Sequence, residues 1–179
     1  MSGAWLREEQ AELAVDKILE AAASAFADLG VSRTRMGHIA QYAGCSRGTL
    51  YRYFKTRREL DIAYIDRSAR LLSAHLKSEL AEIMDPRRRM VEGILRAVKE
   101  VRDSPGMVAW FDPQASGRTA RISHDSRVIN TLSIAFVELV LGLVRVVISL
   151  LTMPGESAEE ERLLVDLFVA PGLMNDARA

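Results

Sequence analysis

Seven arginine or lysine side chains lie between residues 29 and 58, and this stretch contains no aspartate or glutamate. The whole chain of 179 residues balances 24 basic against 24 acidic residues, so the positive charge of this block is local. Arginine and lysine bind phosphate oxygens, and arginine can also donate two parallel hydrogen bonds to guanine. The residue types of this block therefore suit contacts with nucleic acid.

The spacing of small and apolar residues in the same block predicts two short helices joined by a tight turn. Ala40 is small enough for the two helices to cross closely, and Gly44 can adopt the positive φ that the turn requires. Ser46 then predicts the N-cap of the second helix, whose first exposed side chains would be Arg47 and Thr49. Such a helix can enter the major groove of DNA by its N-terminal turn.

Candidate DNA contacts follow from this arrangement. Arg47 is suited to a guanine base, and Gly48 allows close approach of the helix to DNA. The candidates for phosphate contacts lie on the second helix or at helix starts: Thr34, Tyr51, Tyr53, Lys55 and Arg57. Arg35, next to Thr34, belongs to the same candidate set, and Thr34 is also the expected cap of the first short helix.

The run IAQYAGCSRGTLYRYF, followed by KTRREL, resembles the DNA-binding domain of the TetR family of bacterial repressors. The resemblance covers residues 15–62, including the amphipathic helix that ends in FADLG. It implies base contacts from the start of the second helix, namely Ser46, Arg47, Gly48 and Thr49. It also implies phosphate contacts at Thr34, Tyr51, Tyr53, Lys55 and the start of the following helix.

Two positions depart from the family pattern. Arg57 stands where lysine is usual, which keeps the positive charge. Gly37 lies inside the first short helix, where an acidic or polar residue is commoner. Glycine inside a helix costs about 1 kcal/mol relative to alanine, so we expect a looser first helix.

Apolar residues at helical spacing along the rest of the chain predict an all-α fold. The expected helices cover residues 15–29, a long stretch from 56 to about 84, 86–103, 125–152 and 157–170, with irregular or short helical structure over 107–123. Capping boxes are expected at Thr56–Glu59 and Ser157–Glu160. With the family resemblance, we expect a DNA-binding domain over residues 1–64 and a helical effector-binding and dimerisation domain over 65–179.

The apolar stretch 132–153 is long enough to span a bilayer, but Glu138 and Arg145 interrupt it. Each charge at bilayer depth would cost roughly 2.5–3.5 kcal/mol, so we expect burial in a core or subunit interface and no membrane. The family resemblance implies a homodimer through the helices at 125–152 and 157–170. A helical adaptor that uses residues 132–153 to recruit another protein stays open as an alternative.

The family resemblance also implies a pocket for a small-molecule effector in the C-terminal domain. Methionine and aromatic side chains make adaptable apolar pockets, although the same residues also pack cores. The candidates are Leu71, Met90, Ile94, Val98, Met107, Trp110, Phe111, Ile134 and Glu138. Trp110 and Phe111 lead this set because a loop in their irregular segment could close over a ligand.

The sequence offers no nucleophile paired with a base and no phosphate-cradling loop, so we expect neither an enzyme nor a cofactor. His38, His75 and His124 are scattered, which argues against a metal site. Cys45 is the single cysteine, which excludes an intrachain disulfide and fits the cytoplasm; it is either a small buried residue or a redox switch. The resulting hypothesis is a transcriptional regulator, a repressor released from a palindromic operator by a largely apolar effector.

Overall fold

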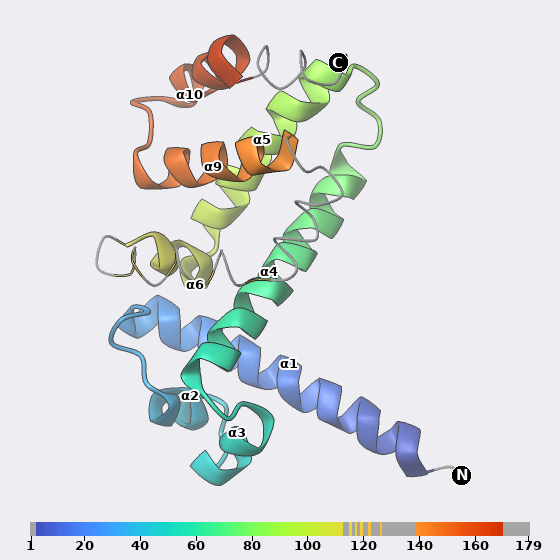
Figure 1. The fold of residues 1–179 in the computed structure, drawn as a ribbon, viewed down its shortest axis with the longest axis vertical. Helices are drawn as coiled ribbons and strands as arrows, with labels where there is room; N and C mark the ends of the chain where they lie inside the picture. Colours follow the sequence, from blue (N-terminus) through green and yellow to red (C-terminus); the bar gives the residue numbers. More distant parts are fainter. Residues whose placement is uncertain are drawn as a thin grey trace. The chain divides into compact units, whose positions relative to one another are not determined.

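Every described element is an α-helix, a 3-10 turn or a π-helical turn, so the all-α prediction is confirmed for the described part of the chain (Figure 1). The computed structural model describes residues 3–112, 115, 117, 119, 122, 126 and 139–169. None of the described helices is long and apolar enough to cross a membrane. The chain divides into two compact units, Met1–Ile65 with Pro105–Ile122, and Asp66–Ser104 with Ser123–Ala179.

The first unit contains α1 (Gly3–Leu29), α2 (Met36–Tyr42), α3 (Arg47–Tyr53) and the beginning of α4 (Arg57–Glu79). It also contains α6 (Pro105–Val108) and the 3-10 turn η1 (Ala109–Phe111). We expected the segment 105–122 to be part of the C-terminal domain. In the structure it belongs to the same compact unit as the two short helices α2 and α3.

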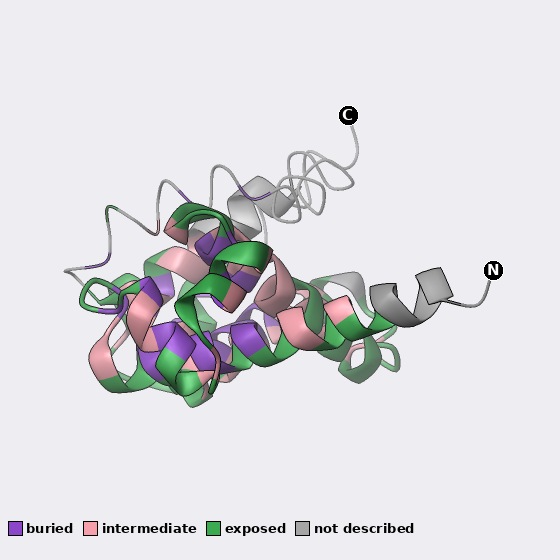
Figure 2. Cartoon of the chain, turned by 90° about the horizontal axis from the view of Figure 1, so that it is seen from below, coloured by how far each residue is buried: buried purple, intermediate pink, exposed green. Residues whose placement is uncertain are grey.

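Helix α1 ends where the sequence predicts. Gly30 follows it with φ +75°, and its N–H donates to the carbonyl of Phe26 at 3.0 Å. A φ in this region strongly favours glycine, which explains the stop. The buried residues of α1 include Ile18, Ala22 and Phe26, which belong to the core of the first unit (purple in Figure 2).

Three aromatic rings form the centre of this core. The ring of Phe26 makes edge contacts with Tyr64 at 5.1 Å and with Trp110 at 5.4 Å between centroids. Edge-to-face pairs of this kind are favourable beyond the apolar area that they bury. Trp110 is only 1% exposed, so the indole of η1 packs α6 and η1 against α1 and α4.

A glycine allows α6 to approach α1 closely. A Cβ on Gly106 would lie 2.7 Å from the carbonyl oxygen of Ala23, 3.0 Å from its Cα and 3.0 Å from the hydroxyl of Tyr64. Two of these three neighbours are backbone atoms of a helix, which cannot move as a side chain can. The contact between α1 and α6 therefore depends on the missing side chain at residue 106.

The second unit contains the rest of α4, α5 (Pro86–Asp103), α9 (Leu139–Thr152), α10 (Ala158–Leu164) and the π-helical turn η2 (Val165–Val169). The predicted range of α5 is confirmed, and the carboxylate of Asp85 caps it by accepting from the N–H groups of Arg87 and Arg88. Helix α9 ends at Thr152 as predicted, whereas residues 127–138 of the expected long helix lie outside the described residues.

The two predicted capping boxes are present in shifted form. The hydroxyl of Thr56 accepts from the N–H of Glu59 at 3.1 Å, as expected. The carboxylate of Glu59, however, accepts from the N–H of Lys55, one residue before the cap. The same shift occurs at Ser157, where the carboxylate of Glu160 accepts from the N–H of Glu156.

An ion pair between an exposed arginine and a buried carboxylate joins three helices of the second unit. Arg102 of α5 donates to both carboxylate oxygens of Glu161 on α10, at 2.9 and 2.7 Å, and to the carbonyl of Leu150 on α9 at 2.9 Å. Glu161 is 4% exposed and also accepts from the N–H of Gly155. These hydrogen bonds from Arg102, and its charge, hold the pKa of Glu161 below its ordinary value of 4.5.

We predict that Gly106→Ala destabilises the protein by about 1–3 kcal/mol, because the new methyl group overlaps the backbone of α1. Urea unfolding measures this change. The control is Gly117→Ala, since an added Cβ at Gly117 meets no atom within 4 Å; it should stay within about 0.5 kcal/mol of the wild type. Equal effects of the two variants would show that α6 does not need the close approach.

We predict that Glu161→Gln lowers the melting temperature more at pH 7 than at pH 4. A carboxyl with a lowered pKa stabilises the fold above its unfolded value near 4.5, and this contribution disappears as the pH falls through the folded value. Thermal unfolding followed by circular dichroism from pH 3.5 to 7.5 tests it. Glu159→Gln, at an exposed position two residues earlier, is the matched control, and a pH-independent loss at Glu161 would contradict the role of its charge.

Candidate nucleic-acid interface

Helices α2 and α3 cross in the way that the sequence predicts. Ala40 and Leu50 are buried at 2% and 0% exposure, so the close contact of the two helices excludes solvent. Gly44 has φ +63°, as the tight turn requires, and the N–H of Cys45 donates to the carbonyl of Ala40 at 2.9 Å. Cys45 is half-buried and packs against the core of the first unit. The predicted helix-turn-helix is therefore present.

Ser46 caps α3 as predicted. Its hydroxyl accepts from the N–H of Thr49 at 3.0 Å, and the two hydroxyl groups lie 3.0 Å apart. The cap holds the first turn of α3 in shape, with Ser46, Arg47 and Gly48 exposed and Thr49 half-buried. The four candidates for base contacts thus share one exposed helix start.

The structure contradicts the predictions for Thr34. The N-cap of α2 is Arg35, whose N–H donates to Nδ1 of His38 at 3.3 Å. The hydroxyl of Thr34 instead points back to α1, where it donates to the carbonyls of Gly30 at 2.7 Å and Ala25 at 3.1 Å. Thr34 is 3% exposed and its hydroxyl already has two acceptors, so this side chain belongs to the core and its hydroxyl is not presented to solvent.

Arg57 makes several contacts within the protein that the sequence did not predict. Its guanidinium donates to Asp61 at 2.6 Å, to the carbonyl of Val31 at 3.3 Å and to the carbonyl of Thr34. The same group lies 5.0 Å from the ring centroid of Phe26, within the range of a cation–π contact. Arg57 therefore links α4 to the connection between α1 and α2.

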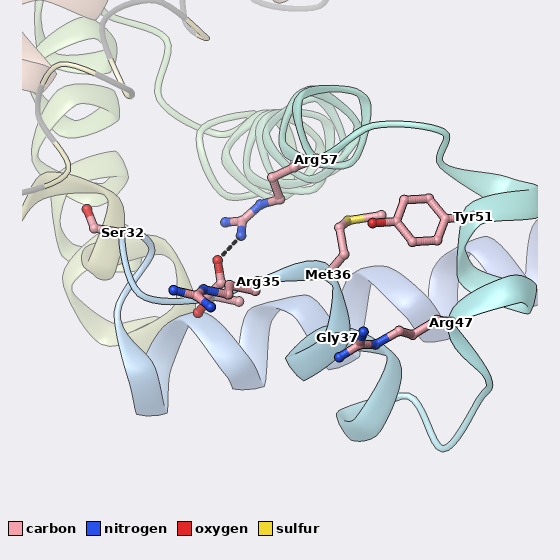
Figure 3. Close-up of a pocket in the computed structure, with 8 residues that line it drawn as sticks. Ser32, Arg35, Met36, Gly37, Arg47, Tyr51 and Arg57 are labelled. Carbon is pink, nitrogen blue, oxygen red and sulfur yellow. Dashed lines mark hydrogen bonds between the residues drawn. The ribbon is translucent and has the colours of Figure 1, made fainter.

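A groove of about 500 Å³ opens between these helices (Figure 3). It is lined by Ser32, Thr34, Arg35, Met36, Gly37, Arg47, Tyr51 and Arg57. Three of these residues are arginines and none is acidic; Arg57 is paired with Asp61, so Arg35 and Arg47 supply the positive charge that suits an anionic ligand. Ser32, Met36 and Gly37 were not among the predicted site residues; only the unusual glycine at position 37 gave a signal in the sequence.

The remaining candidates divide by exposure. Tyr51 is 47% exposed, and Arg35 and Lys55 are also exposed, so their side chains can reach a phosphate. Tyr53 is half-buried, and the guanidinium of Arg52 lies 5.2 Å from the centre of its ring. Of these four candidates, Tyr51 on α3 and Arg35 at the N-cap of α2 line the groove, whereas Tyr53 and Lys55 do not.

The effector candidates do not come together in one unit. Met90, Ile94 and Val98 pack in the core of the second unit, and Leu71 is 56% exposed. Met107, Trp110 and Phe111 belong to the first unit, where Trp110 is part of the aromatic core. Ile134 and Glu138 lie outside the described residues.

The described residues do bring one histidine beside two carboxylates. Nδ1 of His75 lies 2.5 Å from Glu100, and Nε2 lies 3.4 Å from Glu79 one turn along α4. The sequence reasoning overlooked both neighbours. One ligand atom from each of His75, Glu79 and Glu100 lies within 4.8 Å of the other two, so this group could hold a metal ion, which the sequence did not lead us to expect.

Comparisons with known proteins agree with this geometry. The family model described as "Bacterial regulatory proteins, tetR family" matches residues 18–64. An uncharacterised HTH-type transcriptional regulator of Mycobacterium tuberculosis (strain CDC 1551 / Oshkosh) is 35% identical over 180 residues, 93% of this chain and 89% of that protein.

Two solved structures share the fold at low sequence identity. The TetR family repressor AlkX from Dietzia sp. strain DQ12-45-1b has a TM-score of 0.61 at 18% identity, covering 89% of this chain and 94% of that one. The transcriptional regulator FadR from Bacillus subtilis, solved in complex with stearoyl-CoA, has a TM-score of 0.56 at 16% identity, covering 91% of this chain and 89% of that one.

We predict that Arg57→Ala lowers the free energy of unfolding by about 3 kcal/mol, because it removes a charged partner of the buried carboxylate of Asp61 and the hydrogen bonds to the carbonyls of Val31 and Thr34. The neighbouring Arg58→Ala, at an exposed position, should change it by no more than about 0.5 kcal/mol. Urea denaturation of both variants measures the difference. Similar stability of the two variants would show that Arg57 does not hold the helices together.

Proposed function

Because the chain belongs to the TetR family of bacterial transcriptional regulators, we propose that it is a homodimeric repressor that a small molecule releases from a palindromic operator. Each subunit would insert the start of α3 into the major groove of one half-site. Effector binding would change the separation of the two reading helices and so weaken DNA binding. A regulator of chromosomal genes would act in the cytoplasm.

The observation that carries this proposal is the exposed N-terminal turn of α3 beside a groove that Arg35 and Arg47 line and that no acidic residue lines. Arg47 supplies donors for a base, whereas Arg35, Tyr51 and Lys55 would bind phosphates on either side. Thr34 and Arg57 hold this surface in shape from beneath.

The proposed dimer would use α9 and α10, as the sequence predicts. Exposed apolar side chains at and after α10 support this surface: Leu163 is 56% exposed, Leu164 39% and Leu167 52%. A cluster of exposed leucines is costly in water, and burial against a second copy would remove that cost. A dimer also matches the two-fold symmetry of a palindromic operator.

The proposed effector is small and largely apolar. Trp110 supplies one observation in favour of the predicted contacts, because its buried indole N–H has no acceptor among the described residues. A ligand with a polar atom near this N–H would satisfy it. The apolar side chains of Met107 and Phe111 flank the same turn.

We predict that Arg47→Ala reduces discrimination between operator and scrambled DNA more than it reduces binding to scrambled DNA. A bidentate contact with guanine is worth about 1–3 kcal/mol of discrimination. Fluorescence anisotropy with duplexes selected by the wild-type protein measures both affinities. Lys55→Ala is the matched control, since loss of a phosphate contact should weaken both duplexes equally and reduce the salt dependence of binding.

Equal losses on both duplexes for Arg47→Ala would identify Arg47 as a phosphate contact and contradict base reading. The absence of any selected sequence for the wild-type protein would contradict the proposed function itself.

A further inference from the structure

Arg47 does not extend freely from α3; its side chain lies against α2. An ideal Cβ on Gly37 would come within 2.7 Å of Nη2 of Arg47, 3.0 Å of Nε and 3.1 Å of Cζ (Figure 3). Real Cβ atoms essentially never approach another heavy atom as closely as 2.7 Å. The guanidinium therefore occupies the space that any other residue at position 37 would fill.

The backbone does not explain the glycine at this position. Among the described residues the only glycines with positive φ are Gly30 and Gly44, so alanine could adopt the conformation of Gly37. Alanine would also favour the helix, since glycine is among the weakest helix formers. What glycine provides at position 37 is room for Arg47.

The contact leaves the donors of Arg47 available. Within the described part of the chain Arg47 makes no hydrogen bond or ion pair, and its side chain is exposed. The guanidinium lies against α2 at Gly37, and DNA would have to displace no charged partner among the described residues. A guanidinium held in one direction loses less conformational freedom when it binds a base.

We propose that Gly37 is a specificity-determining residue that acts by positioning the guanidinium of Arg47 for base reading. This inference rests on the proposed function, in which Arg47 contacts a base. A side chain at position 37 would turn the guanidinium away from α2 and alter the base pair that it reads. The fold would change little, because the displaced atoms are the mobile end of a long side chain.

A double-mutant cycle tests the coupling between the two positions. The variants are Gly37→Ala, Arg47→Ala and the double variant, with Gln41→Ala as a control at an exposed position on the same helix, outside the residues that line the groove. The probes are a duplex selected by the wild-type protein from a random-sequence library and a scrambled duplex of equal length. Fluorescence anisotropy gives the ratio of the two dissociation constants for each variant.

We expect Gly37→Ala to reduce this ratio by roughly tenfold when Arg47 is present and to leave it unchanged in the Arg47→Ala background. Gln41→Ala should keep the wild-type ratio. Circular dichroism should show at least wild-type helix content for Gly37→Ala, because the substitution favours the helix. Selection with Gly37→Ala should yield a motif that differs at the base pair read by Arg47.

Equal effects of Gly37→Ala in both backgrounds, or no effect in either, would overturn the positioning role and leave the proposed function standing. A wild-type protein that does not discriminate between the duplexes would overturn the proposed function, and the inference with it.

Discussion

The guanidinium of Arg57 is the interaction on which the shape of the DNA-binding unit depends. It joins α4, through Asp61, to the carbonyls of Val31 and Thr34 in the connection between α1 and α2. It also covers the ring of Phe26, which is the centre of the aromatic core. One partly buried charge therefore connects three helices with the packing beneath them. Removing this guanidinium would leave the buried carboxylate of Asp61 without this partner. It would also remove two hydrogen bonds to the backbone of the connection that precedes α2.

The polar residues between positions 29 and 58 fall into two groups, those that bind other protein atoms and those whose donors stay available. Arg57 and Thr34 use their polar atoms inside the protein, so the energy of those hydrogen bonds contributes to the fold. Arg47 keeps its donors free, and packing on Gly37 sets its direction. A recognition surface needs both groups, because donors aimed at bases gain affinity only when the supporting helices do not move. The positive charge of the block is therefore partly structural and partly available to DNA.

Much of this arrangement could be predicted from residue types and spacing. The turn at Gly44, the cap at Ser46 and the ends of α1 and α5 each depend on local backbone chemistry, which a sequence displays directly. The roles of Thr34 and Arg57 depend on atoms distant in sequence: the hydroxyl of Thr34 meets Ala25, and Arg57 meets Val31. Both residues have the types expected of phosphate contacts, and only the three-dimensional structure shows that their polar atoms already bind protein atoms.

The packing of Trp110 against Phe26 could not be predicted from the sequence for the same reason, since no local pattern links η1 to α1. Gly37 is an intermediate case. The sequence shows that glycine is unusual at this position, but only the structure shows that Arg47 lies against it.

In the proposed function, the surface formed by α2 and α3 reads a specific DNA sequence in two symmetric copies. The most direct test is selection of bound duplexes from a random-sequence library with the full-length protein, followed by sequencing of the bound fraction. We expect enrichment of an inverted repeat whose half-site centres lie one helical turn, about 10 base pairs, or a multiple of it apart. Binding without an enriched motif, or enrichment of a single half-site without its inverted copy, would contradict it.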